Sequence, residues 1–137
     1  MYKRLLTTYI QQLAKKYPVI TLLGPRQSGK TTLVKTAFPN KPYVNMEDVD
    51  NRYLATLDPK SFMETYPDGA ILDEVQRTPN LLSYIQVRVD EVKKNGMFIL
   101  TESHQAELHS AVSQSLAGEH LFYAFFLLVC KKCAILK

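Results

Sequence analysis

The sequence predicts an α/β fold, a three-layer α/β/α sandwich around a mostly parallel five-stranded sheet. Short apolar runs rich in β-forming residues alternate with helical segments along the chain, an order typical of a parallel sheet covered by helices on both faces. The 137 residues can form one domain with a substantial core, but not two ordinary domains. Since no repeat, low-complexity segment or linker interrupts them, we expect a single domain over residues 1–137.

The N-terminal part is expected to form a helix, a strand and a second helix. The segment 3–16 is amphipathic and ends before Pro18. The apolar run 19–23, between Pro18 and Gly24, predicts a strand buried on both faces. A helix over about 30–37 follows a glycine-rich loop. The apolar face of the first helix consists of Leu5, Leu6, Tyr9, Ile10 and Leu13.

The middle of the chain contains two short apolar runs separated by helical segments. Residues 42–45 predict the second strand, and 70–73 predict the third, a buried one. Pro67-Asp68-Gly69 is a turn signal directly before the third strand. The segments between the two strands are a polar helix over 49–57 and a turn or helix from Pro59 to Tyr66.

The second half of the chain continues the alternation of helix and strand. Pro79 follows Thr78, a candidate helix cap, and opens a helix that extends to about residue 94. Asn95-Gly96 then turns the chain. The apolar face of this helix consists of Leu81, Leu82, Ile85, Val89 and Val92, and the remaining expected elements are a strand over 97–101, a helix over 105–117 ending at Gly118, and a strand over 121–129.

The glycine-rich loop matches the pattern G-x-x-x-x-G-K-[ST], the Walker A motif. Its glycines permit a tight turn in which backbone N–H groups point at phosphate oxygens, and the following helix directs its positive dipole end at the same anion. Lys30 would contact the β- and γ-phosphates, Thr31 would ligate Mg²⁺, and Thr32 would contact the α-phosphate. The loop residues are Gly24, Pro25, Arg26, Gln27, Ser28, Gly29, Lys30 and Thr31.

A second motif, at residues 70–74, fits a Walker B strand. The apolar run ends in Asp73 and Glu74, so both carboxylates are expected at the carboxyl edge of the sheet, where α/β folds bind ligands. Asp73 would hold Mg²⁺ directly or through water, and Glu74 would act as the general base toward the attacking water. At the end of the next strand, Thr101 or Ser103 could orient that water. These motifs together predict a P-loop NTPase that binds ATP and Mg²⁺.

Several other classes of function lack their signals. GTPase base-reading motifs, nucleophile elbows and His-Glu-x-x-His metal sites are absent from the sequence. Cys130 and Cys133 have Cys-x-x-Cys spacing, but the three histidines offer no matching zinc pair, so we interpret them as two reduced thiols. No apolar run of membrane-spanning length and no secretory signal occurs, so we expect a cytoplasmic protein.

Taken together, these residues resemble bacterial and archaeal AAA-type ATPases whose N-terminal nucleotide-binding domain precedes a C-terminal domain of unknown function. The resemblance implies an AAA-type ATPase fold, ATP and Mg²⁺ as ligands, and the roles given above for Lys30, Thr31, Asp73 and Glu74. The stretches that carry it are Tyr2 to Arg4, Leu23 to Thr32, Tyr43 to Asp48, Ile71 to Arg77, Leu81 to Gln86, Phe98 to Thr101 and Val112 to Gly118.

The sequence departs from the family pattern in three places. Thr101-Glu102-Ser103 stands where the family has Thr-Gly-Ser, which adds an anion beside the expected γ-phosphate site. Glu119 stands where the family has an arginine that could stabilise phosphate charge. Residues 119–137 do not resemble the family, so we expect a truncated or divergent end.

The expected function is Mg-ATP binding, with weak hydrolysis catalysed by Glu74 and Ser103. An alternative is a nucleotide-binding module that does not hydrolyse ATP and acts through self-association or a protein partner. A nucleic-acid-stimulated ATPase has only the net charge of +4 in its favour.

Overall fold

The computed structural model describes residues 2–24 and 29–103, and in this part of the chain four strands form one parallel sheet. The spatial order is β1-β4-β3-β2, and every neighbouring pair is parallel. The carboxyl ends of all four strands therefore meet at one edge of the sheet. The strands are β1 (Val19–Gly24), β2 (Tyr43–Asn45), β3 (Ala70–Asp73) and β4 (Phe98–Ser103). The prediction of an α/β fold with a parallel sheet is confirmed.

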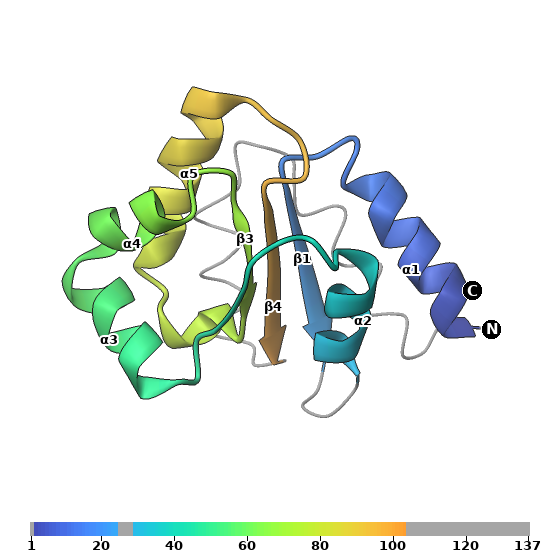
Figure 1. Ribbon diagram of the computed structural model, residues 1–137, viewed down its shortest axis with the longest axis horizontal. Helices are drawn as coiled ribbons and strands as arrows, with labels where there is room; N and C mark the ends of the chain where they lie inside the picture. Colours follow the sequence, from blue (N-terminus) through green and yellow to red (C-terminus); the bar gives the residue numbers. More distant parts are fainter. Residues whose placement is uncertain (1, 25–28, 104–137) are drawn as a thin grey trace.

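Helices cover both faces of the sheet. Figure 1 shows helices on both sides of the strands, which gives the three layers. The first side carries α1 (Tyr2–Leu13) and α2 (Lys30–Ala37), and the second carries α3 (Val49–Leu57), α4 (Pro59–Thr65) and α5 (Leu81–Val92), with the short 3₁₀ helix η1 (Val75–Arg77) directly after β3.

Each face of the sheet packs on its own apolar cluster. Side chains alternate along a strand, so β1 sends Ile20 and Leu22 to the α1/α2 side and Val19 to the other side. In β4, Ile99 joins the α1/α2 cluster, and Phe98 joins the cluster under α3, α4 and α5. Every residue of β1, β3 and β4 is buried, as continuous apolar runs predict for strands covered on both faces.

The buried face of α1 is narrower than the sequence predicts. Ile10 is fully buried, but Leu5 is 65% exposed and Tyr9 is 38% exposed. The helix is attached to α2, where the Gln11 side chain donates a hydrogen bond of 2.8 Å to the Ala37 carbonyl. Among the described residues, α1 packs beside α2, and its covered stripe consists of Ile10 with the partly buried Leu6 and Leu13. α1 also ends at Leu13, three residues before the expected end at residue 16.

The predicted helix from Pro79 is shifted and shortened in the structure. α5 begins at Leu81 and ends at Val92, and Val92, expected on its buried face, is 43% exposed. Between Glu74 and α5, the chain forms η1 and then a second tight turn. In this second turn the Leu81 N–H donates a hydrogen bond to the Thr78 carbonyl. These turns use Thr78 and Pro79, so neither residue belongs to the helix.

β4 is longer than its apolar run. We expected the strand to end at residue 101, but Glu102 and Ser103 continue the pairing with β1, opposite Leu23 and Gly24. The polar residues thus belong to the buried sheet. The expected helix 105–117, the fifth strand 121–129 and both cysteines lie outside the described residues. Within the described residues, no helix is long and apolar enough to cross a membrane.

Candidate nucleotide-binding site

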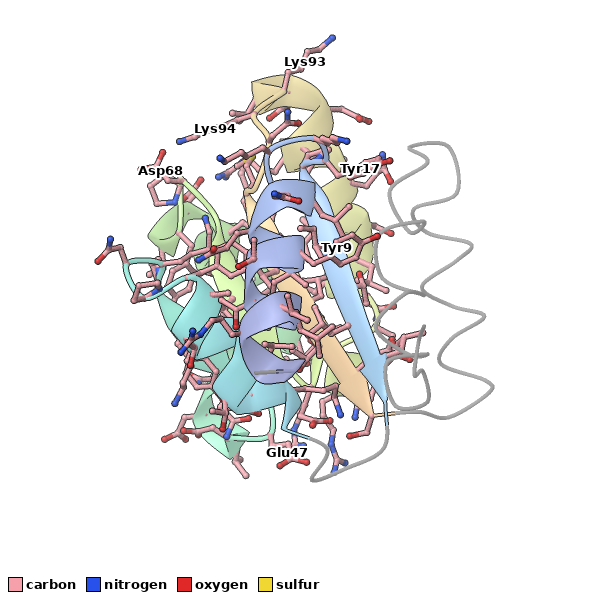
Figure 2. All side chains as sticks on the ribbon, turned by 90° about the vertical axis from the view of Figure 1, so that its right-hand side faces the viewer. Tyr9, Tyr17, Glu47, Asp68, Lys93 and Lys94 are labelled. Carbon is pink, nitrogen blue, oxygen red and sulfur yellow. The ribbon has the colours of Figure 1, made fainter. Side chains whose placement is uncertain are left out.

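The predicted site residues gather at the carboxyl edge of the sheet. Gly24 lies opposite Ser103 in the register of β1 and β4, and Asp73 ends β3 between β4 and β2. Glu47, just past β2, marks this edge in Figure 2, and Lys93 and Lys94 mark the opposite end of the molecule. The two sequence motifs, far apart in the chain, therefore reach the same edge.

The N-terminus of α2 opens directly from the loop. Gly29 caps the helix with φ 91° and ψ 10°, a left-handed conformation, and has no side chain that could cap the first turn. A Cβ atom at Gly29 would meet nothing within 4 Å, so the backbone conformation rather than lack of space requires glycine here. Backbone N–H groups at the N-terminus of a helix are suited to an anion. Pro25, Arg26, Gln27 and Ser28, which were also predicted to bind phosphate, lie outside the described residues.

Lys30 lies at the mouth of this loop. Its side chain is largely buried, and its Nζ donates a hydrogen bond of 3.0 Å to the Gly24 carbonyl. The ammonium group is thus held between the two ends of the loop. Thr31 is half-buried and Thr32 is exposed on the same first turn of α2.

Asp73 is the centre of a cluster of hydroxyl groups. Its Oδ2 accepts hydrogen bonds from Thr31 Oγ1, at 2.8 Å, and from the Tyr43 hydroxyl. Its Oδ1 accepts one from the Thr101 hydroxyl. Asp73 is only 4% exposed, and these donors compensate for the lost hydration of its carboxylate. Thr31 and Asp73, which were each predicted to hold Mg²⁺, thus contact each other directly.

Tyr43 is the site residue that sequence reasoning missed. It was expected as part of a strand and of a stretch that resembles the family, without a role in the site, yet its hydroxyl reaches the Asp73 carboxylate. Burial raises the pKa of the Tyr43 phenol, and the hydrogen bond to Asp73 and the charge of that carboxylate raise it further. The phenol is therefore a proton donor at neutral pH.

Glu74 adopts a left-handed conformation, with φ 61° and ψ 48°, directly after β3. Its backbone N–H donates to Thr101 Oγ1 at 2.9 Å, and its carboxylate accepts from Ser103 Oγ at 2.9 and 3.1 Å. The Gln76 amide also donates to Glu74 Oε1, at 2.6 Å. A non-glycine residue held in this region is strained, and such strain is often found at functional sites.

Two hydroxyls were predicted as candidates to orient water. Ser103 contacts the Glu74 carboxylate, whereas the Thr101 hydroxyl donates to Asp73 instead. Thr101 is fully buried, donates to Asp73 and accepts from the Glu74 N–H. Thr101 therefore fixes both acidic residues of the motif relative to each other. Ser103 is the hydroxyl that contacts the candidate base.

Glu102 lies between Thr101 and Ser103 in β4, so its side chain is on the opposite face of the strand from theirs. Its carboxyl group is fully buried, and neither oxygen has a hydrogen-bond partner in the described part of the chain. Burial, assisted by the charge of Glu74, raises the pKa of Glu102 from 4.5 to about 7. This carboxyl group is thus protonated in a substantial fraction of molecules at neutral pH.

The pair Thr31 and Asp73 fits a Mg²⁺ ion. Both offer hard oxygen donors, and Mg²⁺ in nucleotide sites is usually held by one or two carboxylates, substrate phosphates and water. Among residues 2–24 and 29–103, no cluster of three or more His, Cys, Asp or Glu side chains could hold a metal. A site that uses phosphate oxygens does not require such a cluster.

The fold and the site define the class of protein, a P-loop domain of the AAA type. A family model described as an AAA domain matches residues 16–132, and the chain belongs to this family. Two uncharacterized proteins, from Mycobacterium bovis and Mycobacterium tuberculosis, are each 32% identical over 111 residues. These matches cover 80% of this chain and 25% of each relative, so the chain spans about a quarter of their length.

A solved structure supports the fold. The DnaC helicase loader matches with a TM-score of 0.54 and 18% sequence identity, over 85% of this chain and 82% of that one. At this identity the likeness concerns the fold alone. Membership of the AAA family indicates nucleotide binding.

Proposed function

We propose that this chain is the ATP-binding domain of an AAA-type ATPase and that it binds Mg-ATP at the carboxyl edge of its sheet. One observation carries the proposal: the Thr31 hydroxyl contacts the Asp73 carboxylate at 2.8 Å, beside the buried Lys30 ammonium. The Walker A and Walker B residues therefore meet where α2 begins. This arrangement joins an anion site to a pair of metal-binding oxygens.

Each part of this site has a distinct role in binding. The loop from Gly24 to Gly29 and the first turn of α2 would bind phosphate oxygens through backbone N–H groups, and Lys30 would neutralise the β- and γ-phosphates. Thr32 would contact the α-phosphate. Thr31 and Asp73 would hold Mg²⁺, which, when bound, neutralises charge on the phosphate oxygens.

For hydrolysis, the proposal assigns the general base to Glu74 and an orienting role to Ser103. The hydroxyl of Ser103 donates to the Glu74 carboxylate at 2.9 Å, and Thr101 anchors the Glu74 backbone. These contacts fix both the side chain and the backbone of Glu74, so the carboxylate needs little reorganisation when it accepts a proton from an attacking water. The expected turnover is weak, because Glu102, a second acid near Glu74, adds negative charge beside the expected γ-phosphate site.

That same second acid favours an alternative function, a module that binds nucleotide without hydrolysing it. The buried Glu102 carboxyl has no hydrogen-bond partner in the described residues, so ionising it next to Glu74 is costly. An ionised Glu102 beside the γ-phosphate would instead repel the negative charge of the nucleotide and slow hydrolysis. Stimulation of turnover by DNA or RNA would instead support a nucleic-acid-dependent ATPase, which the net charge alone suggests.

The hydrolysis assignment is tested with Glu74→Gln. The amide keeps the size of the side chain but cannot accept a proton as a base, so Mg-ATP should still bind while phosphate release stops. Phosphate release should be measured under single-turnover conditions, with and without DNA or RNA. Equal rates for the variant and the wild type would show that Glu74 is not the base, and a wild-type rate at background would favour the non-hydrolysing module.

A further inference from the structure

The hydrogen bonds of Asp73 leave little of its carboxylate for a metal. An ionised carboxylate offers about four lone-pair positions. The hydroxyls of Thr31, Tyr43 and Thr101 occupy three of them, two on Oδ2 and one on Oδ1. A metal ion, or a water molecule bound to it, must therefore use the remaining position or displace one of these donors.

The three donors differ in what they could give to a metal. Thr31 can keep its proton on Asp73 and offer an oxygen lone pair to the ion, because a hydroxyl donates and accepts at once. Thr101 is fully buried and also holds the Glu74 N–H, so its displacement would leave buried polar groups unpaired. Tyr43 is the donor whose removal costs the site least, since it is only half-buried.

Two further contacts hold Tyr43 in this position. Its ring packs on the apolar cluster between the sheet and α2, and the Lys35 ammonium lies 4.1 Å above the ring centroid. The attraction between the cation and the ring face helps to fix the ring, and with it the position of the hydroxyl. The Tyr43 hydroxyl is therefore a well-placed competitor for Asp73 Oδ2.

We propose that the Tyr43 hydroxyl sets how tightly the site binds its divalent cation, by occupying the position on Asp73 that the metal or its bound water takes. This inference rests on the proposed Mg-ATP function. Tyr43 acts on the metal through Asp73, so it is a positioning residue. When the cation binds, the phenol releases Oδ2, and the site requires more Mg²⁺ than it would with Asp73 held by Thr31 and Thr101 alone.

The test is Tyr43→Phe, which keeps the ring, its packing and the contact with Lys35. Binding of a fluorescent ATP analogue should be measured against Mg²⁺ concentration. In Tyr43→Phe, the Mg²⁺ concentration that gives half of the maximal increase in analogue binding should be about three- to tenfold lower than in the wild type. This shift is expected because one charge-assisted hydrogen bond no longer competes with the metal for Asp73. A damaged site would need more Mg²⁺, so an unchanged or increased requirement overturns the inference.

Tyr66→Phe is the matched control, because it removes a tyrosine hydroxyl from the cluster under α3, α4 and α5, where the ring packs against Phe62. Its Mg²⁺ requirement should equal that of the wild type. In the wild type itself, Mg²⁺ should change the near-ultraviolet tyrosine absorbance as the phenol leaves Asp73, and this change should be absent from Tyr43→Phe. An absorbance change of equal size in both proteins would contradict the displacement.

These outcomes separate the inference from the function on which it rests. If the analogue binds the wild type and Lys30→Ala equally, the proposed function fails. If binding depends on Lys30 but Tyr43→Phe has the wild-type Mg²⁺ requirement, only the role of Tyr43 fails.

Discussion

Two buried carboxyl groups at the carboxyl edge of the sheet have opposite surroundings. Asp73 accepts hydrogen bonds from three hydroxyls, whereas Glu102 has no partner in the described residues. Burial without compensating hydrogen bonds disfavours the charged form, which is why the pKa of Glu102 rises to about 7. Glu102 therefore reduces the stability of the fold when it ionises.

The pH dependence of stability should reveal this group. The folded-state pKa of Glu102 lies above the ordinary 4.5, so the unfolded chain releases this proton first as pH rises. The contribution of Glu102 to the free energy of unfolding should thus fall between about pH 4.5 and 7, by on the order of 1–3 kcal/mol, and change little above that.

Glu102→Gln, which cannot ionise, should lack this loss. Urea denaturation across the same pH range should show the variant gaining stability relative to the wild type as pH rises. Parallel profiles for the two proteins would show that Glu102 ionises as an ordinary carboxyl group.

At the level of single residues, the sequence indicated which residues belong to the candidate site, but not all of the contacts between their side chains. Asp73, Glu74, Lys30 and Ser103 were identified because their motifs have fixed local spacing, and the structure brings them to one edge. Their roles remain predictions. Tyr43 was missed because its contact with Asp73 depends on how two strands align, and local patterns carry no information on that alignment.

Among the secondary-structure elements, those with sharp local boundaries were predicted best. The helix over 49–57 and the strand over 70–73 have the expected bounds, since Asp48 caps the first and a turn precedes the second. The start of α5 was wrong because the left-handed Glu74 and the turns after it follow no periodic pattern. The end of β4 was wrong because tertiary pairing with β1 outweighs the polarity of Glu102 and Ser103.

The turn before β3 packs closely against the start of β4, and a substitution at Gly69 tests whether this close packing stabilises the fold. Gly69 has φ +95°, and a Cβ there would lie 1.8 Å from the Met97 carbonyl oxygen, next to β4. Gly29 has a similar φ of +91°, but open space around it. Gly69→Ala should therefore combine backbone strain with a steric clash and destabilise the fold by roughly 3–5 kcal/mol.

Gly29→Ala is the matched control, because it adds the backbone strain alone. It should cost only about 1–2 kcal/mol. The free energies of unfolding can be compared by urea denaturation. Equal losses for the two variants would mean that the close approach of Gly69 to Met97 contributes nothing to stability.

For the whole molecule, the alternation of strands and helices was enough to predict the layered parallel fold. The alternation does not tell which helices share a face, and the structure places α1 and α2 together opposite α3, α4 and α5 (Figure 1). That grouping brings the first turn of α2 to Asp73 at the carboxyl edge. The two motifs supply the residues of the site, and the topology of the sheet brings those residues together.

The central claim is that this edge binds Mg-ATP through Lys30. Its most direct test is equilibrium titration of a fluorescent ATP analogue, in the presence of Mg²⁺, onto the wild type, Lys30→Ala and Lys94→Ala. Lys94 lies at the opposite end of the molecule, so its variant controls for the loss of one positive charge (Figure 2). Saturable binding by the wild type and Lys94→Ala, with none by Lys30→Ala, is the predicted result, and undiminished binding by Lys30→Ala would contradict the account.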